Sequence, residues 1–259
     1  MRPLRKVWHT RADQRALRPL VIGEVVRDWL AIPEDLIWYP YHPSIRTNEL
    51  AAELWPWRRI LEERQTFQGN MADAGLRWWE YMQHTASAYS TALSIVFAFV
   101  ATHNHFALDR GNKVFKQSAP VIKLPEGGSE KEHLRLLGLL NSSTACFWLK
   151  QVSHNKGRPG AEQAGADEPW EHRYEFTGTK LEEFPLPEAY PLESARELDA
   201  LARRLSEVSP AAVAAEDTPT RERLVGTHGQ WESTRGRMVA LQEELDWEVY
   251  SAYGLLDDD

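Results

Sequence analysis

LSIVFAFVATHNHFALDRGNKVFKQSAPVIKL, residues 93–124, decides how the chain folds. Apart from Ser94, its first eight residues are apolar and rich in β-branched and aromatic side chains, which predicts a central, buried strand. The following run, 105–116, alternates around a loop at 109–112, where Gly111 can supply a positive φ. The stretch therefore predicts a central strand followed by a β-hairpin.

Two histidines lie where the expected strand ends and the hairpin begins, and they raise the question of a metal site. His103 and His105 are two residues apart, so their side chains share a face if the chain is extended there. No third ligand or acidic partner follows at the spacing usual for a metal, so we expect no metal site. A small hydrolase or nuclease that uses the two histidines stays as an alternative, which metal analysis of the purified chain would test.

Helices are expected on both sides of this β-structure. Residues 44–67 carry apolar side chains at helical spacing, with Asn48 as a cap and Pro56 as a kink or restart. The aromatic-rich residues 77–92 predict a second short helix. Residues 129–152 predict the clearest helix, because a serine begins it and a glutamate follows three residues later, as in a capping box.

The rest of the chain alternates between loops and regular elements. We expect, in order, a long loop, a strand with a proline-rich exit, and two amphipathic helices: 153–173, 174–187, 193–208 and 221–255. The fold class is therefore α+β, with a mostly antiparallel sheet flanked by helices and a C-terminal helical pair. We expect one domain over residues 1–190 and a helical region over 191–259, with a linker at about 209–219.

Composition predicts a soluble globular protein. The chain has 259 residues, of which 42% are hydrophobic and 11 are Trp, enough for a sizeable core. The longest apolar stretch, Leu93–Ala101, is about half of the roughly 20 residues that cross a membrane, so we expect no membrane partner. A single cysteine, Cys146, excludes an internal disulfide and a cysteine-rich zinc site. These features predict a cytoplasmic location.

Charge is distributed unevenly along the chain. The formal net charge is −8, but residues 1–160 carry 21 Lys and Arg against 15 Asp and Glu, whereas residues 161–259 carry 9 against 23. A mildly basic body is thus followed by an acidic region. The basic excess is weak support for a polyanionic partner such as nucleic acid.

Self-sufficient catalytic motifs are absent from the sequence. It contains no G-x-x-x-x-G-K phosphate loop, no G-x-G-x-x-G, no G-x-S-x-G and no H-E-x-x-H. Candidate carboxylate pairs, such as Glu182 with Glu183, lie in solvated contexts and are read as surface charge. We therefore predict no catalytic residues in this chain.

Five blocks carry a family resemblance over nearly the whole chain. They resemble the C-terminal half of large bacterial adenine-specific DNA methyltransferases, including PglX-type proteins of phage-exclusion systems and fused restriction–modification enzymes. The most specific part is the Leu-Asn-Ser-Ser helix followed by the Lys-Leu…Phe-Pro-Leu-Pro strand. The blocks are RPLVIGEVVRDW (18–29), FAFVATHNHFALDRGNKVFKQSAPVIKL (97–124), LLGLLNSSTACFWLK (136–150), YEFTGTKLEEFPLP (174–187) and LQEELDWEVYSAYGL (241–255).

The resemblance implies a role in target recognition. In that family this half grips double-stranded DNA and selects the sequence, while the N-terminal half binds S-adenosylmethionine and methylates a flipped-out adenine. The family's Asn-Pro-Pro-Tyr catalytic block is absent here. We therefore expect no cofactor in this chain, with S-adenosylmethionine held by a separate methyltransferase catalytic polypeptide, unless the chain is the remnant of a split gene.

The candidate DNA contacts are polar loop residues, since cations bind phosphates and amides or guanidinium groups read base edges. The first-rank candidates are Arg110, Asn112, Lys113, Lys116, Gln117, Asn155, Lys156 and Arg158. Second-rank candidates are Arg18, Arg27 and His105. We interpret Trp29 as a core anchor and the hydroxyl and amide groups of Asn141–Ser143 as helix-internal hydrogen-bonding groups.

A different class of function stays open beside DNA binding. The two terminal amphipathic helices could dock on a separate methyltransferase polypeptide without direct DNA contact, which would make the chain a protein-interaction subunit. Co-purification with such a polypeptide, together with DNA affinity that is indifferent to Lys113→Ala and Lys116→Ala, would favour this alternative.

Overall fold

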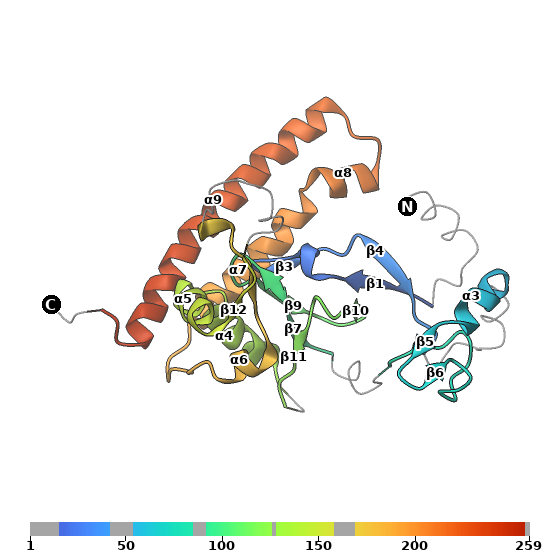
Figure 1. The fold of residues 1–259 in the computed structure, drawn as a ribbon. Coiled ribbons are helices and arrows are strands. Elements are labelled where there is room, and N and C mark those ends of the chain that lie inside the picture. The colour runs from blue at the N-terminus through green and yellow to red at the C-terminus, as the bar shows by residue number, and fades with distance from the viewer. Residues whose placement is uncertain (1–15, 42–53, 85–91, 126–127, 158–168, 257–259) are drawn as a thin grey trace. The chain divides into compact units, whose positions relative to one another are not determined.

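The computed structural model of the chain describes residues 16–41, 54–84, 92–125, 128–157 and 169–256 (Figure 1). These residues form two compact units, which are described separately. The first unit holds the described residues within 1–20, 35–91 and 112–114, and the second holds those within 21–34, 92–111 and 115–259.

Short strands and one short helix make up the first unit. Strand β1 (Leu17–Val21) pairs antiparallel with β4 (Asp35–Trp38), and β10 (Val114–Phe115) joins β1 on its other side. A 3-10 turn that contains Pro56 leads into α3 (Arg58–Glu62), so a helical segment starts just after the proline. The helix expected over 44–67 is wrong beyond Glu62, because a turn and a strand follow, and its residues 44–53 lie outside the described part of the chain. The hairpin of β5 (Gln65–Thr66) and β6 (Gly69–Asn70) follows.

The helix expected over residues 77–92 is wrong for its described part, 77–84, which forms turns. The guanidinium group of Arg64 donates to the carbonyl oxygens of Trp78 (2.9 Å) and Glu80 (2.7 Å). Those oxygens are acceptors that a helix would need for its own backbone, so a tertiary contact replaces the helical hydrogen bonds. Residues 85–91 lie outside the described part of the chain.

A three-stranded antiparallel sheet forms the centre of the second unit. Strand β7 (Ser94–Phe97) lies between β9 (Phe106–Asp109) and β11 (Val121–Ile122), and every residue of β7 and β9 is buried. The prediction of a central buried strand is therefore confirmed. Burial of both faces explains why the sequence shows a continuous apolar run in place of strict alternation.

The hairpin expected over residues 105–116 is wrong. Its first half, β9, pairs with β7, whereas its second half, β10, pairs with β1. Gly111 does take the positive φ that the sequence indicated (93°), and Asn112 follows at 63°. The turn therefore exists, but it sends the chain to another sheet.

Two further antiparallel sheets belong to the described part of the second unit. Strand β13 (Tyr174–Glu175) lies between β12 (His154–Asn155) and β8 (Val100–Ala101), and β2 (Val26–Arg27) pairs with β3 (Leu30–Ala31). The expected strand over 174–187 is thus short. After β13 the chain turns into α6 (Gly178–Glu182), which Thr177 caps with its hydroxyl.

The long helix expected over 129–152 is two helices, α4 (Glu130–Leu140) and α5 (Ser143–Val152). The capping box at its start is confirmed, with both reciprocal bonds between Ser129 and Glu132 present. The break comes at Asn141, which ends α4, and Ser142, whose hydroxyl accepts from the Ala145 amide at 3.1 Å and caps α5.

Three helices follow at the C-terminal side: α7 (Leu192–Glu207), α8 (Pro210–Glu216) and α9 (Arg221–Ala252). The long helix α9 packs along α7 (Figure 1). Ser209 caps α8 within the stretch where we expected a linker. The expected apolar stripe of α9 is confirmed, because Leu241, Leu245 and Val249 are buried.

One core joins the sheet to these helices. Phe97, Phe106, Leu137, Leu198 and Leu245 belong to the same cluster of buried side chains. The α+β class is therefore confirmed, although several small antiparallel sheets replace a single one. The domain boundary near residue 190 stays a prediction. In the described part of the chain, no helix has the length and apolar character needed to traverse a membrane.

Candidate functional site

The segment that links β8 to β9, residues 102–105, is hydrogen-bonded to the end of α4. The Asn104 side chain is buried and donates to the carbonyl oxygen of Leu140 at 2.5 Å. Next to it, the side-chain amide of Asn141 donates to the Phe106 carbonyl oxygen and accepts from the Phe106 amide, both at 3.0 Å. The end of α4 therefore fixes the backbone that carries His103 and His105.

The hairpin of β2 and β3 brings an acidic side chain to the same place. Its two-residue turn is Asp28 and Trp29, and Trp29 has a φ of 66°, which is uncommon for a bulky residue. Trp29 is nevertheless anchored: its ring is buried, its backbone amide donates to the Phe106 carbonyl (2.9 Å), and its indole Nε1 donates to Gln242 Oε1 (2.9 Å). This anchored turn presents Asp28.

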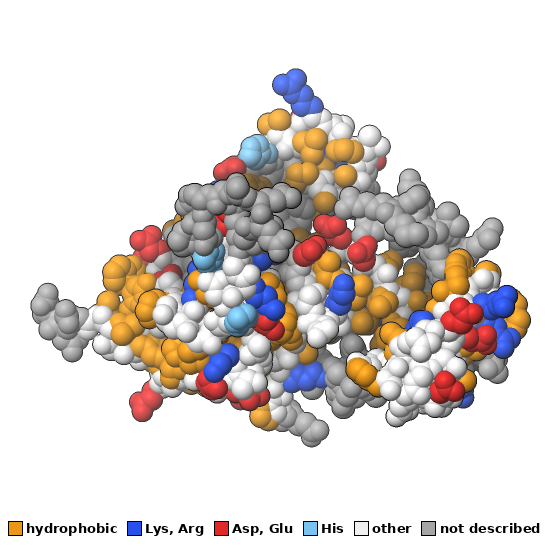
Figure 2. Space-filling view, in the orientation of Figure 1, with side chains coloured by type: hydrophobic (Ala, Val, Ile, Leu, Met, Phe, Trp, Pro, Cys, Tyr) orange, Lys and Arg blue, Asp and Glu red, His pale blue; other side chains and the backbone are white. Residues whose placement is uncertain are grey.

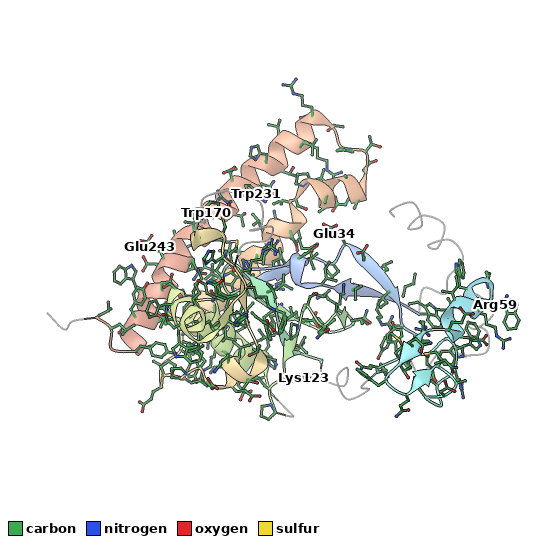
Figure 3. The ribbon with its side chains drawn as sticks, viewed as in Figure 1. Glu34, Arg59, Lys123, Trp170, Trp231 and Glu243 are labelled. Carbon is green, nitrogen blue, oxygen red and sulfur yellow. The ribbon has the colours of Figure 1, made fainter. Side chains whose placement is uncertain are left out.

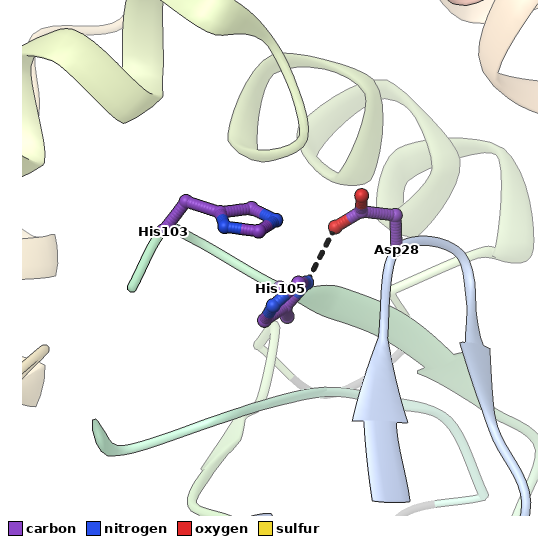
Figure 4. Close-up of side chains that lie close together, drawn as sticks. All are labelled: Asp28, His103 and His105. Atoms are coloured by element: carbon purple, nitrogen blue, oxygen red, sulfur yellow. Dashed lines mark hydrogen bonds and ion pairs between the residues drawn. The ribbon is translucent and has the colours of Figure 1, made fainter. Parts of the chain in front are cut away.

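Asp28, His103 and His105 form one cluster, which we call the Asp–His–His cluster (Figure 4). His105 Nδ1 lies 2.7 Å from Asp28 Oδ1, and the rings of His103 and His105 have centroids 4.1 Å apart. One possible ligand atom from each of the three residues lies within 4.8 Å of the other two. His103 Nδ1 also makes a 3.0 Å hydrogen bond with Thr102 Oγ1.

The three side chains differ in exposure and charge. His105 is buried, with 9% of its side chain exposed, whereas 52% of the Asp28 side chain is exposed. Burial lowers the pKa of His103, and the neighbouring His105, Lys150 and Arg27 lower it further, against the opposing effect of Asp28. His103 is therefore biased toward its neutral form at neutral pH.

Sequence reasoning identified the two histidines but missed the carboxylate. Asp28 lies far from His105 along the chain and reaches it only because the β2–β3 hairpin stacks against the start of β9. Spacing motifs cannot detect such a partner. The expectation that no metal binds here rested on the lack of a third ligand nearby in sequence, and Asp28 now offers one.

Arg110, the first of the predicted DNA contacts, is engaged with two carboxylates of the second unit. Its guanidinium group lies 2.7 Å and 3.2 Å from the oxygens of Asp199, which is buried, and 2.5 Å from Glu130 Oε1. These bonds connect the end of β9 to α4 and α7. Arg110 therefore has a structural role that sequence analysis did not assign.

Lys116 and Gln117 are exposed on a turn with a firmly held backbone. The Ala119 amide donates to the Lys116 carbonyl (2.8 Å) and the Phe99 amide donates to the Ser118 carbonyl (3.0 Å). Gly23 donates its amide to the Ser118 hydroxyl (3.1 Å). In the first unit, Asn112 is exposed and Lys113 is half-buried.

The second group of predicted contacts surrounds β12. Asn155 Nδ2 lies 3.0 Å from His172 Nδ1, and Asn155 Oδ1 accepts from the Gly157 amide at 2.7 Å. Lys156 is exposed and forms a 2.5 Å ion pair with Glu175 on β13. Arg158 lies outside the described residues. These side chains are at the surface, but local partners hold them.

The second-rank candidates lie in different units. Arg18 belongs to the first unit, is half-buried and donates to the Leu17 carbonyl (3.0 Å). Arg27 belongs to the second unit and donates to the Val26 carbonyl (2.7 Å), next to Asp28. His105 is in the Asp–His–His cluster described above.

Two structural interpretations from the sequence can be refined. Trp29 is a core anchor, as expected. Of the Asn141–Ser143 groups, the Ser142 hydroxyl bonds locally at the helix ends, to the Leu139 carbonyl and from the Ala145 amide. Asn141 and Ser143 bond to other elements: the Ser143 amide donates to Asp246 Oδ1 and its hydroxyl bonds the Tyr250 hydroxyl, both at 2.7 Å. Burial raises the pKa of Asp246, against the bonds from Ser143 and Gln242 that lower it.

Positive charge is dispersed on the face of the second unit that Figure 2 shows. Over this unit, Figure 2 shows Lys and Arg side chains interspersed with Asp and Glu side chains. The ion pairs of Arg110, Lys156 and Lys180 with neighbouring carboxylates are examples. On the face that Figure 2 shows, a contact with a polyanion would therefore use a few displayed cations and not a broad basic surface.

The chain thus has an α+β fold with an Asp–His–His cluster and polar turns, and it can now be compared with known proteins. It is 51% identical over 259 residues to the adenine-specific methyltransferase PglX of Streptomyces coelicolor. The match covers 96% of this chain but 21% of that protein, so the chain spans about a fifth of its relative's length. No family model matches the chain.

This similarity supports the resemblance read from the five sequence blocks at a coarser level. The chain is similar to a segment of an adenine-specific methyltransferase. The further prediction, that the segment belongs specifically to the recognition half, is not tested by this similarity.

Proposed function

We propose that the chain is a DNA-binding specificity module of an adenine-specific DNA methylation system, of the restriction–modification or phage-exclusion type. The observation that carries the proposal is the 51% identity to a segment of an adenine-specific methyltransferase. Methyl transfer and S-adenosylmethionine binding are assigned to a catalytic half outside this sequence, since the Asn-Pro-Pro-Tyr block is absent from it.

The turn at residues 116–119 supports a DNA-reading role. A specificity contact needs a cation or amide group displayed from a backbone that does not move when DNA binds. Lys116 and Gln117 meet this need, because their side chains are exposed while the turn is bonded to Val21, Gly23 and Phe99. Lys116 suits a phosphate and Gln117 suits a base edge.

An apolar side chain in the first unit adds a second type of contact. Phe67 is at the tip of the β5–β6 hairpin and is 94% exposed. Proteins that deform DNA often insert such a side chain between base steps. In this proposal Phe67 contacts bases by stacking, so Phe67→Ala lowers affinity for a specific duplex while leaving the unfolding midpoint unchanged.

Fluorescence anisotropy with plasmid-derived duplexes tests the proposal. Affinity should fall steeply between about 50 and 200 mM salt, and Lys116→Ala should reduce the slope of log affinity against log salt by about 1. Lys131→Ala is the matched control, because Lys131 is an exposed lysine of α4 outside the candidate set. Binding that does not exceed background, or that is indifferent to salt, would reject the proposal.

The alternative, a protein-interaction subunit, is favoured by one feature of α9. Val225, Val239 and Trp247 on this helix are 65%, 60% and 51% exposed. In Figure 3, side chains project from α9 along its length, among them those of Trp231 and Glu243. If a catalytic polypeptide co-purifies with the chain, and if neither Lys113→Ala nor Lys116→Ala changes the affinity for DNA, the alternative replaces the proposal.

A further inference from the structure

We propose that Asp28, His103 and His105 form a binding site for a divalent transition-metal ion, with Zn²⁺ as the representative ion. The three side chains converge from two separate parts of the chain, and a possible ligand atom of each lies within 4.8 Å of the others. In Figure 4 the His103 ring points toward Asp28 and the His105 ring. This inference goes beyond DNA binding and is tested without DNA.

The donor set selects the class of ion. Two imidazole nitrogens and one carboxylate oxygen suit Zn²⁺ and its first-row neighbours, whereas Mg²⁺ and Ca²⁺ prefer all-oxygen sites. Three protein ligands leave at least one position for water or another ligand, as in open zinc sites. Asp28 and the exposed His103 lie on the solvent side, so an ion can enter.

The distances require only small movements. Zinc bonds of about 2.0–2.2 Å in a tetrahedral arrangement place ligand atoms roughly 3.3 Å apart. The 2.7 Å separation of His105 Nδ1 and Asp28 Oδ1 therefore opens slightly, as a metal ion takes the place of the proton that these two atoms share. The exposed His103 ring closes the remaining distance.

The surroundings favour a ligating form of His103 and fix the backbone of both histidines. When His103 Nδ1 donates to Thr102 Oγ1, Nε2 keeps its lone pair and faces the cluster. The backbone under both rings is held by Asn104 and Asn141, and Asp28 is held by the anchored Trp29. The positive φ of Trp29 is the kind of backbone strain that structures retain at functional sites.

Two nearby positive side chains, Arg27 and Lys150, repel a metal ion, and replacing one of them gives a further test. Arg27 and Lys150 act on His103 with positive charge, while Asp28 supplies the negative charge. The same positive groups keep His103 neutral, which a metal ion requires. At a pH where His103 is already neutral only the charge repulsion remains, so Arg27→Gln should tighten Zn²⁺ binding there.

Metal titration of the purified full chain tests the site. Metal-free protein is titrated with ZnCl₂ by calorimetry and with CoCl₂ by visible absorption, and one equivalent of each is expected to bind, with Co²⁺ bands typical of a low-coordinate site. His103→Ala and Asp28→Asn should each weaken binding at least about tenfold. Both residues are exposed enough for the variants to fold, which circular dichroism verifies.

His228→Ala is the matched control, because His228 is an exposed histidine on α9 and 68% of its side chain is accessible. Its affinity for Zn²⁺ should equal that of the unaltered chain. Absence of a one-to-one complex would overturn the proposal, as would affinity unchanged in both His103→Ala and Asp28→Asn. Because no DNA is present, failure here leaves the DNA-binding proposal intact, and the reverse also holds.

Discussion

Replacement of Asn141 by alanine should destabilise the second unit strongly. The Asn141 amide makes two hydrogen bonds to the backbone of Phe106, which is fully buried. The Phe106 carbonyl keeps a second partner, the Trp29 amide at 2.9 Å. The Phe106 amide would be left with no partner that we observe, so the substitution removes two bonds and orphans one buried donor.

The expected cost follows from those counts. The lost bond to the Phe106 carbonyl costs about 1 kcal/mol net, and the orphaned Phe106 amide costs about 1–3 kcal/mol, which already includes the loss of its own bond, so the free energy of unfolding should fall by roughly 2–4 kcal/mol. For a chain of this size the midpoint of thermal unfolding should drop by about 10 °C. Alanine tolerates the φ of −90° at this position, so backbone strain contributes nothing.

Urea unfolding followed by tryptophan fluorescence measures the effect. Ser143→Ala provides the comparison, because it removes one neighbouring hydroxyl, bonded to Tyr250, and should cost about 1 kcal/mol. A loss below about 0.5 kcal/mol for Asn141→Ala would refute the reasoning. If stability stayed the same while sequence preference on DNA changed, Asn141 would instead be a base-reading residue, since asparagine pairs well with adenine.

Other substitutions probe the packing, the charges and the pH response. Gly23→Ala should cost roughly 1–3 kcal/mol in urea unfolding, because the added Cβ would lie 2.4 Å from the Ser118 carbonyl oxygen, whereas Gly226→Ala, with open space around it, should stabilise α9. Asp199→Ala should cost about 2–4 kcal/mol, since this buried carboxylate holds two arginines, and an effect under 0.5 kcal/mol would argue against that role. Burial, with a smaller effect of a neighbouring tyrosine, raises the pKa of Tyr253 to about 12. This pKa exceeds that of an unfolded tyrosine, about 10, so the stabilising contribution of Tyr253 is full below pH 10 and is lost toward pH 12. In Tyr253→Phe, the free energy of unfolding should therefore fall less between pH 10 and pH 12.

Local signals in the sequence were read correctly because they depend on neighbours along the chain. The capping box of Ser129 and Glu132, the proline at residue 56 and the positive φ of Gly111 each involve a few adjacent residues. The buried β7 strand was predictable as well, because its composition reflects burial on both faces. These features fixed the α+β class.

Features set by distant partners could not be read. The turn at 109–112 suits a hairpin locally, so the sequence predicts that β9 pairs with the strand after the turn. In the structure β9 pairs with β7. Asn141 was placed inside a helix because its neighbours are helical, whereas its amide is satisfied by Phe106. Asp28 was not associated with His105 for the same reason: the contact exists only after the sheet has formed.

The long helix α9 has a consequence for how the polypeptide matures. Leu245 and Val249 fill the same core as Ile95 and Phe97, so contacts of very large sequence separation complete the hydrophobic centre. The residues up to Val249 must emerge from the ribosome before the hydrophobic centre can form. Contacts between residues so far apart in sequence also slow folding. Until then the apolar sides of α5 and α7 are uncovered, so this protein should depend on chaperones during synthesis and should aggregate when translation stops within α9.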